Sequence, residues 1–131
     1  MRAAIPILLA WGALLTSVEK SAAQDTIPPV LLGSWVQDDM GPVATYRRTY
    51  YFRPDGSYEF AFTVRPRGAG DQQTLAREDG TFRVRGGRLV IAPRSGPARA
   101  LPWSVDRDPY VGDVRLVLLR PDGTMDVFVR P

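Results

Sequence analysis

The chain has 131 residues, with 17 basic and 14 acidic side chains, no histidine and no cysteine. Without these two residue types it lacks the usual general base near neutral pH, a thiol nucleophile, disulfides and ordinary zinc sites. Every basic residue except Lys20 is an arginine, and the arginines are scattered among acids. This pattern argues against a nucleic-acid partner, and the length is that of one domain.

The first 23 residues are typical of a secretory signal peptide. Arg2 supplies a basic start, residues 3–15 form an apolar core, and Ser21-Ala22-Ala23 places small residues at a cleavage site. The apolar run is shorter than the ~20 residues that a membrane-spanning helix needs. We therefore expect cleavage near Ala23, export to the periplasm or the medium, and no membrane span in the mature chain.

Residues 24–43 are predicted to form an N-terminal arm and the start of a barrel, and residues 44–131 the remainder of that barrel. Residues 30–32 have room for one helical turn. From residue 44 onward, apolar and polar side chains alternate with the period of a half-buried strand. Two such strands, 45–52 and 57–64, carry large side chains at even positions and are joined by Arg53-Pro54-Asp55-Gly56, which has the chemistry of a hairpin turn.

The rest of the chain repeats strand and turn. Two-residue turns are predicted at Asp79-Gly80 and Gly86-Gly87, and Arg120-Pro121-Asp122-Gly123 nearly copies the first turn. The strands between the turns are expected at 74–78, 81–85, 88–92, 99–106, 114–119 and 124–130. This pattern predicts an all-β fold, a small up-and-down antiparallel barrel of about eight strands, in preference to a Greek-key sandwich.

Five segments, in order along the chain, point to a family. They are Leu32-Gly33-Ser34-Trp35, Tyr51-Phe52-Arg53-Pro54-Asp55-Gly56-Ser57-Tyr58, Gly80-Thr81-Phe82-Arg83-Val84, Leu89-Val90-Ile91 and Phe128-Val129-Arg130. Together they resemble the secreted bacterial lipocalin-like domains of the calycin superfamily. The resemblance implies that Gly33 and Trp35 mark the closed end of a barrel and that Arg130, with Arg120 as the alternative, packs across the tryptophan. The chain is shorter than an ordinary lipocalin, which limits the size of any cavity.

No constellation of residues predicts catalysis, a cofactor or a metal. The serines lie outside any nucleophile elbow. The acidic pairs Asp38-Asp39 and Glu78-Asp79 occupy strand or turn positions in which neighbouring side chains diverge. Asp106 and Asp108 lack the glycine and glutamate of a calcium loop. We therefore expect a non-enzymatic protein with no catalytic and no metal-binding residues.

Arg48 is the strongest candidate for ligand recognition. Its even position puts a charge on the aromatic face of its strand, and a buried charge needs a partner. A ligand carboxylate inside the barrel would be such a partner; alternatively, Arg48 lies at the barrel mouth or a bulge turns it outward. The candidate ligand-binding residues are Arg48, Tyr50, Phe60, Phe62, Phe82 and Trp103.

The sequence thus predicts an exported, monomeric, lipocalin-like binding module for a small apolar or amphipathic ligand. A barrel of eight strands is just wide enough for its own side chains or one small ligand, so a filled core without a ligand is the nearest alternative. Two further hypotheses are an inhibitor of secreted metalloproteases, with residues 24–29 as its arm, and a module that contacts the cell envelope through an exposed barrel wall.

Overall fold

The computed structural model describes residues 26–68 and 70–131, so the predicted signal peptide lies outside the described residues. The elements are η1 (Pro29–Leu31), β1 (Gly33–Met40), β2 (Ala44–Phe52), β3 (Ser57–Pro66), β4 (Gln73–Arg85), β5 (Arg88–Pro93), β6 (Arg99–Arg107), β7 (Val114–Leu119) and β8 (Met125–Val129). Every strand pairs antiparallel with the next, and β1 pairs with β8. The predicted all-β, up-and-down barrel is confirmed.

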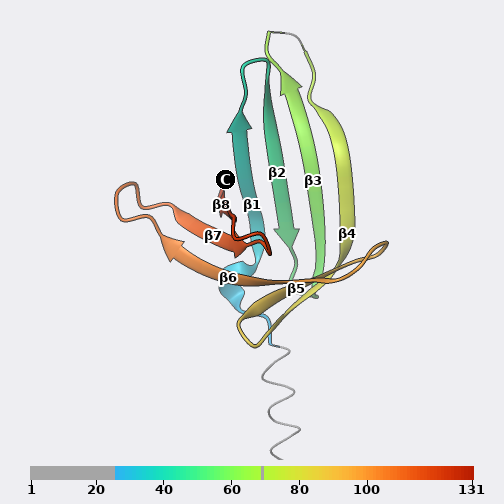
Figure 1. The fold of residues 1–131 in the computed structure, drawn as a ribbon, viewed down its shortest axis with the longest axis vertical. Coiled ribbons are helices and arrows are strands. Elements are labelled where there is room, and N and C mark those ends of the chain that lie inside the picture. Colours follow the sequence, from blue (N-terminus) through green and yellow to red (C-terminus); the bar gives the residue numbers. More distant parts are fainter. Residues whose placement is uncertain (1–25, 69) are drawn as a thin grey trace, which may run out of the picture.

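The first four strands extend beyond the others. Figure 1 shows β1 to β4 side by side in a tall sheet, whose lower end is crossed by β5 to β8. β1 meets β8 at a single register pair, Val36 with Val129, and β4 pairs with β5 only from Gly80 onward. Residues 37–40 of β1, 44–48 of β2, 62–66 of β3 and 73–77 of β4 therefore form a projecting sheet above the closed part of the barrel.

The predicted turn at Asp79-Gly80 is wrong, because β4 continues through both residues as one strand. The backbone of Gly80 lies so close to β5 that an added Cβ would be 2.1 Å from the carbonyl oxygen of Ala92. Asp79 is paired with Arg94, at 2.9 Å between carboxylate and guanidinium. Gly80 thus marks the corner at which β4 passes from β3 to β5, a use of glycine that resembles a turn signal in the sequence.

The other predicted turns are confirmed. In the β2–β3 hairpin, Gly56 N donates to Arg53 O at 3.1 Å, and in the β7–β8 hairpin Gly123 N donates to Arg120 O at 3.0 Å. Gly86-Gly87 joins β4 to β5. The helical turn expected at 30–32 is η1, which begins one residue earlier.

The closed part of the barrel is filled by its own side chains. The largest side chains with less than 2 % exposure are Trp35, Tyr58, Phe52, Phe128, Leu31, Leu89, Ile91, Leu116 and Leu118. They come from η1 and from strands along the whole barrel, and they form one hydrophobic core. The alternation predicted for β2 is present, since Tyr50 and Phe52 are buried while Tyr51 between them is exposed. In β3, Phe60 and Phe62 share the inner face with the rings of β2, but Thr63 on the other face is buried as well. Because this core occupies the interior, the inner face is accessible mainly where the projecting sheet begins.

Candidate binding site at the barrel mouth

One end of the barrel is closed by Trp35 and η1. The indole of Trp35 is fully buried, and its Nε1 donates to the carbonyl oxygen of Leu31 at 2.8 Å. The guanidinium of Arg130 lies over this ring, with its Cζ 3.8 Å from the ring centroid. Its terminal nitrogens donate to the carbonyl oxygens of Leu32 and Val30, both at 2.6 Å. Arg130 therefore stacks on the indole and satisfies carbonyl groups at the helical turn.

Gly33 permits this close approach. Its φ is +103°, and an added Cβ would lie 2.9 Å from Nη1 of Arg130. Burial lowers the pKa of the Arg130 guanidinium. Arg120, the alternative partner for Trp35, instead pairs with Asp126, with 2.7 Å between Nε and Oδ2. The closed end is thus occupied by the chain's own groups, whose role is to hold the fold together.

The other end of the closed part opens onto the inner face of the projecting sheet. We call this region the mouth and define it by Gln37, Arg48, Phe62 and Asp126. Arg48 is half-buried, its Nη1 donates to Oε1 of Gln37 at 3.1 Å, and its Cζ is 4.9 Å from the ring centroid of Phe62. Among the described residues, no carboxylate forms an ion pair with Arg48. Arg48 therefore lies on the aromatic face and at the mouth.

Asp126 faces the same region but is held by another arginine. Hydrogen bonds from Arg120 are the main reason that the pKa of Asp126 is lowered, and Gln37 and Arg48 contribute less. The carboxylate is the partner of Arg120, at 2.7 Å. The positive charge of Arg48 is therefore not neutralised by direct contact with this acid.

Aromatic rings cover the inner face around Arg48. The rings of Tyr46 and Phe62 are stacked with centroids 5.9 Å apart, and those of Tyr50 and Phe60 are 4.8 Å apart. Tyr50 is only 8 % exposed and joins the filled core, whereas the other three rings are half-buried. An apolar surface beside an unpaired cation suits a ligand that has an apolar part and a negative charge.

A second polar cluster joins β3, β4 and β6. The hydroxyl of Tyr58 donates to Oε2 of Glu78 at 2.8 Å, and Nη2 of Arg99 donates to the same oxygen at 2.7 Å. Burial is the main cause that raises the pKa of Tyr58, and Glu78 adds to it; burial also raises the pKa of Tyr50. Because each charged group here has a partner within the chain, we regard the cluster as structural.

The structure brings four of the predicted ligand-binding residues to one place: Arg48, Tyr50, Phe60 and Phe62. Phe82 is 4 % exposed, and its ring centroid is 4.8 Å from that of Phe52. It therefore belongs to the filled core and not to the accessible part of the inner face.

Trp103 lies on a different wall of the barrel. It pairs across the sheet with Leu118, which in turn pairs with Asp126, so the three residues form one row that ends at the mouth. Trp103 is half-buried, and among the described residues its buried Nε1 has no hydrogen-bond partner. A buried donor of this kind is normally satisfied by water or by a ligand.

Sequence reasoning missed Gln37, Glu78, Arg99 and Asp126. Gln37 meets Arg48 through the β1–β2 register, and Asp126 reaches the mouth through the closure of β8 on β1. Neither relationship has a local sequence signal. The inward position of Glu78 could have been predicted if residues 73–85 had been interpreted as one strand. In such a strand Glu78 and Phe82 are four residues apart and therefore share the inner face.

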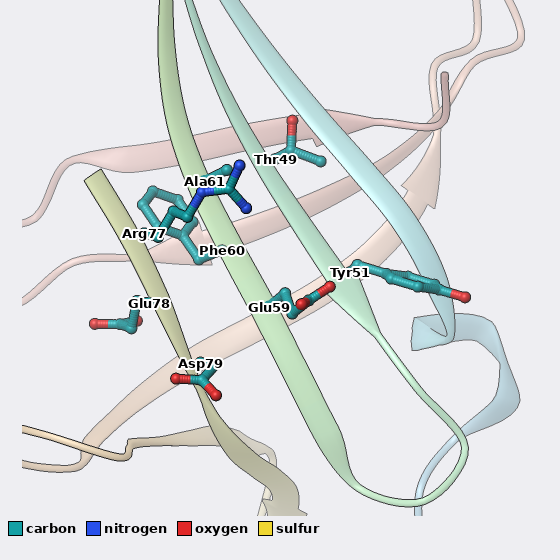
Figure 2. Close-up of a pocket in the computed structure, with 8 residues that line it drawn as sticks. All are labelled: Thr49, Tyr51, Glu59, Phe60, Ala61, Arg77, Glu78 and Asp79. Carbon is teal, nitrogen blue, oxygen red and sulfur yellow. The ribbon is translucent and has the colours of Figure 1, made fainter. Parts of the chain in front are cut away.

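Figure 2 shows another pocket, of about 310 Å³, on the outer wall of β2, β3 and β4. Six of its lining residues point outward from these strands, and Phe60 and Glu78, whose side chains lie on the inner face, also border it; the outward ones are Thr49, Tyr51, Glu59, Ala61, Arg77 and Asp79. Glu59 is paired with Arg53 at 2.6 Å, and Asp79 with Arg94 at 2.9 Å. The Arg53 guanidinium also lies 5.0 Å from the ring centroid of Tyr51. The groups that would attract a cation are therefore already engaged by the chain's own arginines.

The predicted N-terminal arm is described from Thr26 onward. Ile27 is partly buried against the core, and Leu31 N donates to Pro28 O at 3.0 Å. This part of the chain is therefore packed on the barrel. An arm that enters a protease would have to lie before it, outside the described residues.

The described residues contain no group of three or more acidic side chains placed to hold a metal ion. No helix among them is long and apolar enough to cross a membrane. Comparisons of the chain with protein-family models, curated proteins and solved structures find no match. The structure thus defines a class, a small closed up-and-down β-barrel with a filled core and a basic, aromatic mouth.

Proposed function

We propose that this protein is a lipocalin-like, non-enzymatic binding protein that holds a small amphipathic anion at its mouth, with the anionic group paired to Arg48. The observation that carries the proposal is the environment of this guanidinium. It is half-buried on an aromatic face, it contacts Gln37 and Phe62, and it has no carboxylate partner among the described residues. A ligand carboxylate would supply the missing partner through a charge-assisted hydrogen bond.

The lipocalin-like assignment rests on two features. The strands follow each other around a closed barrel of up-and-down topology, and a tryptophan at one end is covered by an arginine from beyond the last strand. Both features match what the sequence resemblance implies. Export of this binding protein is a separate part of the proposal and rests on the predicted signal peptide.

The filled core restricts how a ligand would lie. An apolar tail would run from Phe60 at the mouth along the inner face of the projecting sheet, over Tyr46 and Phe62, instead of entering a deep cavity. The buried indole N–H of Trp103, which has no hydrogen-bond partner among the described residues, would be a second donor for a ligand that extended along the row linking Trp103 to Asp126. We therefore favour a linear or flat amphiphile over a bulky ligand.

The proposal is tested by titrating the protein with decanoic acid and with decanol, which share a tail and differ in charge. We expect the acid to bind more tightly, and Arg48→Gln to weaken acid binding by about tenfold, since a hydrogen bond to a charged group contributes ~1.5–3 kcal/mol. Decanol binding should change little.

Arg83→Gln is the matched control, because it removes the same charge from an exposed position on the outer wall of β4. It should leave the affinity for both compounds unchanged. Equal losses for acid and alcohol in the Arg48 variant, or no uptake of either compound, would leave the filled barrel without a ligand as the better account.

A further inference from the structure

A pocket of about 210 Å³ lies on the outer wall of the projecting sheet, on the opposite face from Arg48. It is lined by Asp38, Thr45, Arg47, Thr63, Arg65 and Gln72. The strand register explains the arrangement. Arg47 is directly opposite Thr63, and Thr45 is directly opposite Arg65, so two arginines and two threonines alternate at the corners of a square.

Arg47 is held in place by a carboxylate. Its Nε is 2.7 Å from Oδ1 of Asp38 and its Nη2 is 2.9 Å from Oδ2, a bidentate pair. A guanidinium has five N–H groups, and this pair uses two of them. The remaining donors of Arg47 are free to meet a second acceptor, while Asp38 fixes the plane of the group.

Arg65 provides the uncompensated charge of the pocket. Among the described residues it forms no ion pair and no side-chain hydrogen bond. With Arg47 and Asp38 neutralising each other, Arg65 leaves the pocket with a net positive charge. Thr63 is only 8 % exposed and forms the floor, and the Thr45 hydroxyl and the Gln72 amide are further potential donors at the wall.

We propose that this pocket binds a phosphate group, held between the guanidinium groups of Arg47 and Arg65. Paired arginines fit the oxygen geometry of phosphate, and hydroxyl and amide donors complete such sites. The volume of the pocket admits a phosphate with a small substituent. This site is separate from the mouth and does not depend on the function proposed for Arg48.

The neighbourhood of the pocket suggests two sources for the phosphate. Met40 is in the same cross-strand row as Thr45, and Val43 is in the following turn; each is 72 % exposed. An apolar tip beside a phosphate site is the arrangement by which a protein contacts the headgroups and outer acyl region of a membrane surface. A soluble phosphate ester would bind in the pocket without contacting the apolar tip formed by Met40 and Val43.

The test measures binding of inorganic phosphate by calorimetry, and binding to vesicles of phosphatidylglycerol or phosphatidylcholine by flotation, at physiological ionic strength. We expect phosphate or at least one vesicle type to bind, and Arg65→Gln to weaken that binding about tenfold. Arg83→Gln, which removes an equal charge elsewhere on the outer wall, should have no comparable effect.

A double variant, Met40→Ser with Val43→Ser, separates the two sources. If it abolishes vesicle binding and leaves phosphate binding unchanged, the phosphate belongs to a lipid headgroup. If only inorganic phosphate binds, and the tip variant binds it normally, the source is soluble. The proposal is overturned if neither probe binds, or if the Arg65 and Arg83 variants lose affinity equally, since that result indicates only a diffuse charge effect.

Discussion

Arg130, next to the C-terminus, stacks on Trp35 in the first strand, with 3.8 Å between the guanidinium carbon and the indole centroid. The same guanidinium donates to the carbonyl oxygens of Leu32 and Val30. These contacts span the seam of the barrel, where the β1–β8 ladder consists of the single pair Val36 and Val129. A side chain therefore reinforces a closure that has few backbone hydrogen bonds.

The first prediction concerns this pair. Trp35→Ala should cost about 3–5 kcal/mol of unfolding free energy, as for other large buried aromatic residues, and Arg130→Ala should cost less. The two losses should be less than additive, because either variant removes the stacking contact. Urea denaturation of both single variants and the double variant measures the coupling.

Arg120→Ala is the control for the pair, because Arg120 is bound to Asp126 at a half-exposed position and does not contact Trp35. It should have little effect on unfolding free energy, since solvent-exposed ion pairs contribute little to stability, and its effect should add to the loss from Trp35→Ala. Full additivity between Trp35→Ala and Arg130→Ala would reject the stacked pair as a stabilising unit.

The second prediction concerns Gly33. Gly33→Ala introduces a Cβ at φ +103° and 2.9 Å from Nη1 of Arg130, so it should both strain the backbone and displace the guanidinium. Gly86→Ala is the control, since Gly86 has φ +58° and open space around its Cβ position. We expect ~1 kcal/mol for the Gly86 variant and a larger loss for the Gly33 variant. If the two variants lose equal stability in thermal unfolding, the Arg130 guanidinium is displaced by the new Cβ without an energetic penalty.

The third prediction concerns alkaline pH. Folding raises the pKa of Tyr58 and Tyr50 above the ordinary value of 10.0. Because the folded state holds these protons more tightly, their contribution to stability is complete below pH ~10 and is lost as the pH rises through the folded-state pKa. Tyr58→Phe removes one of these protons and should reduce the loss of stability above pH ~10.

Urea denaturation of the parent protein and of the Tyr58→Phe variant, repeated from neutral to alkaline pH, checks this sign. At neutral pH the variant should be less stable by ~1 kcal/mol, since Glu78 loses a donor. The difference between the two proteins should shrink as the pH rises. If the unfolding free energy of both proteins falls equally with rising pH, the Tyr58 hydroxyl is not a cause of the alkaline loss of stability.

Local pattern was sufficient to predict the inner face of β2 and β3. Alternation placed Tyr50 and Phe52 inward and put Arg48 on the same face, because a strand has a fixed period of two. The resemblance named Trp35 and Arg130 as partners, although 95 positions separate them in the printed numbering. The first group was predictable from alternation along one strand, and the second from residue type within the segments that carry the resemblance.

The features that the sequence did not predict depend on strand register and strand length. The contact of Arg48 with Gln37 follows from the β1–β2 register, which no local motif specifies. The projecting sheet exists because β4 is 13 residues long and pairs with β5 along only its second part. Glycine at position 80 was misread as a turn because a corner and a turn both require a residue without a side chain.

The most direct test of the central claim, that Arg48 binds an anionic amphiphile at the mouth, is an NMR titration with decanoate that follows the arginine Nε–H and tryptophan Nε1–H signals. Variants Arg48→Gln and Arg65→Gln assign the two relevant arginine signals. We predict a saturable shift of the Arg48 signal and of the Trp103 indole signal, while the signals of Arg65 and of the buried Trp35 indole stay in place. Saturable binding that leaves the Arg48 signal unmoved, or no binding at all, would contradict the account.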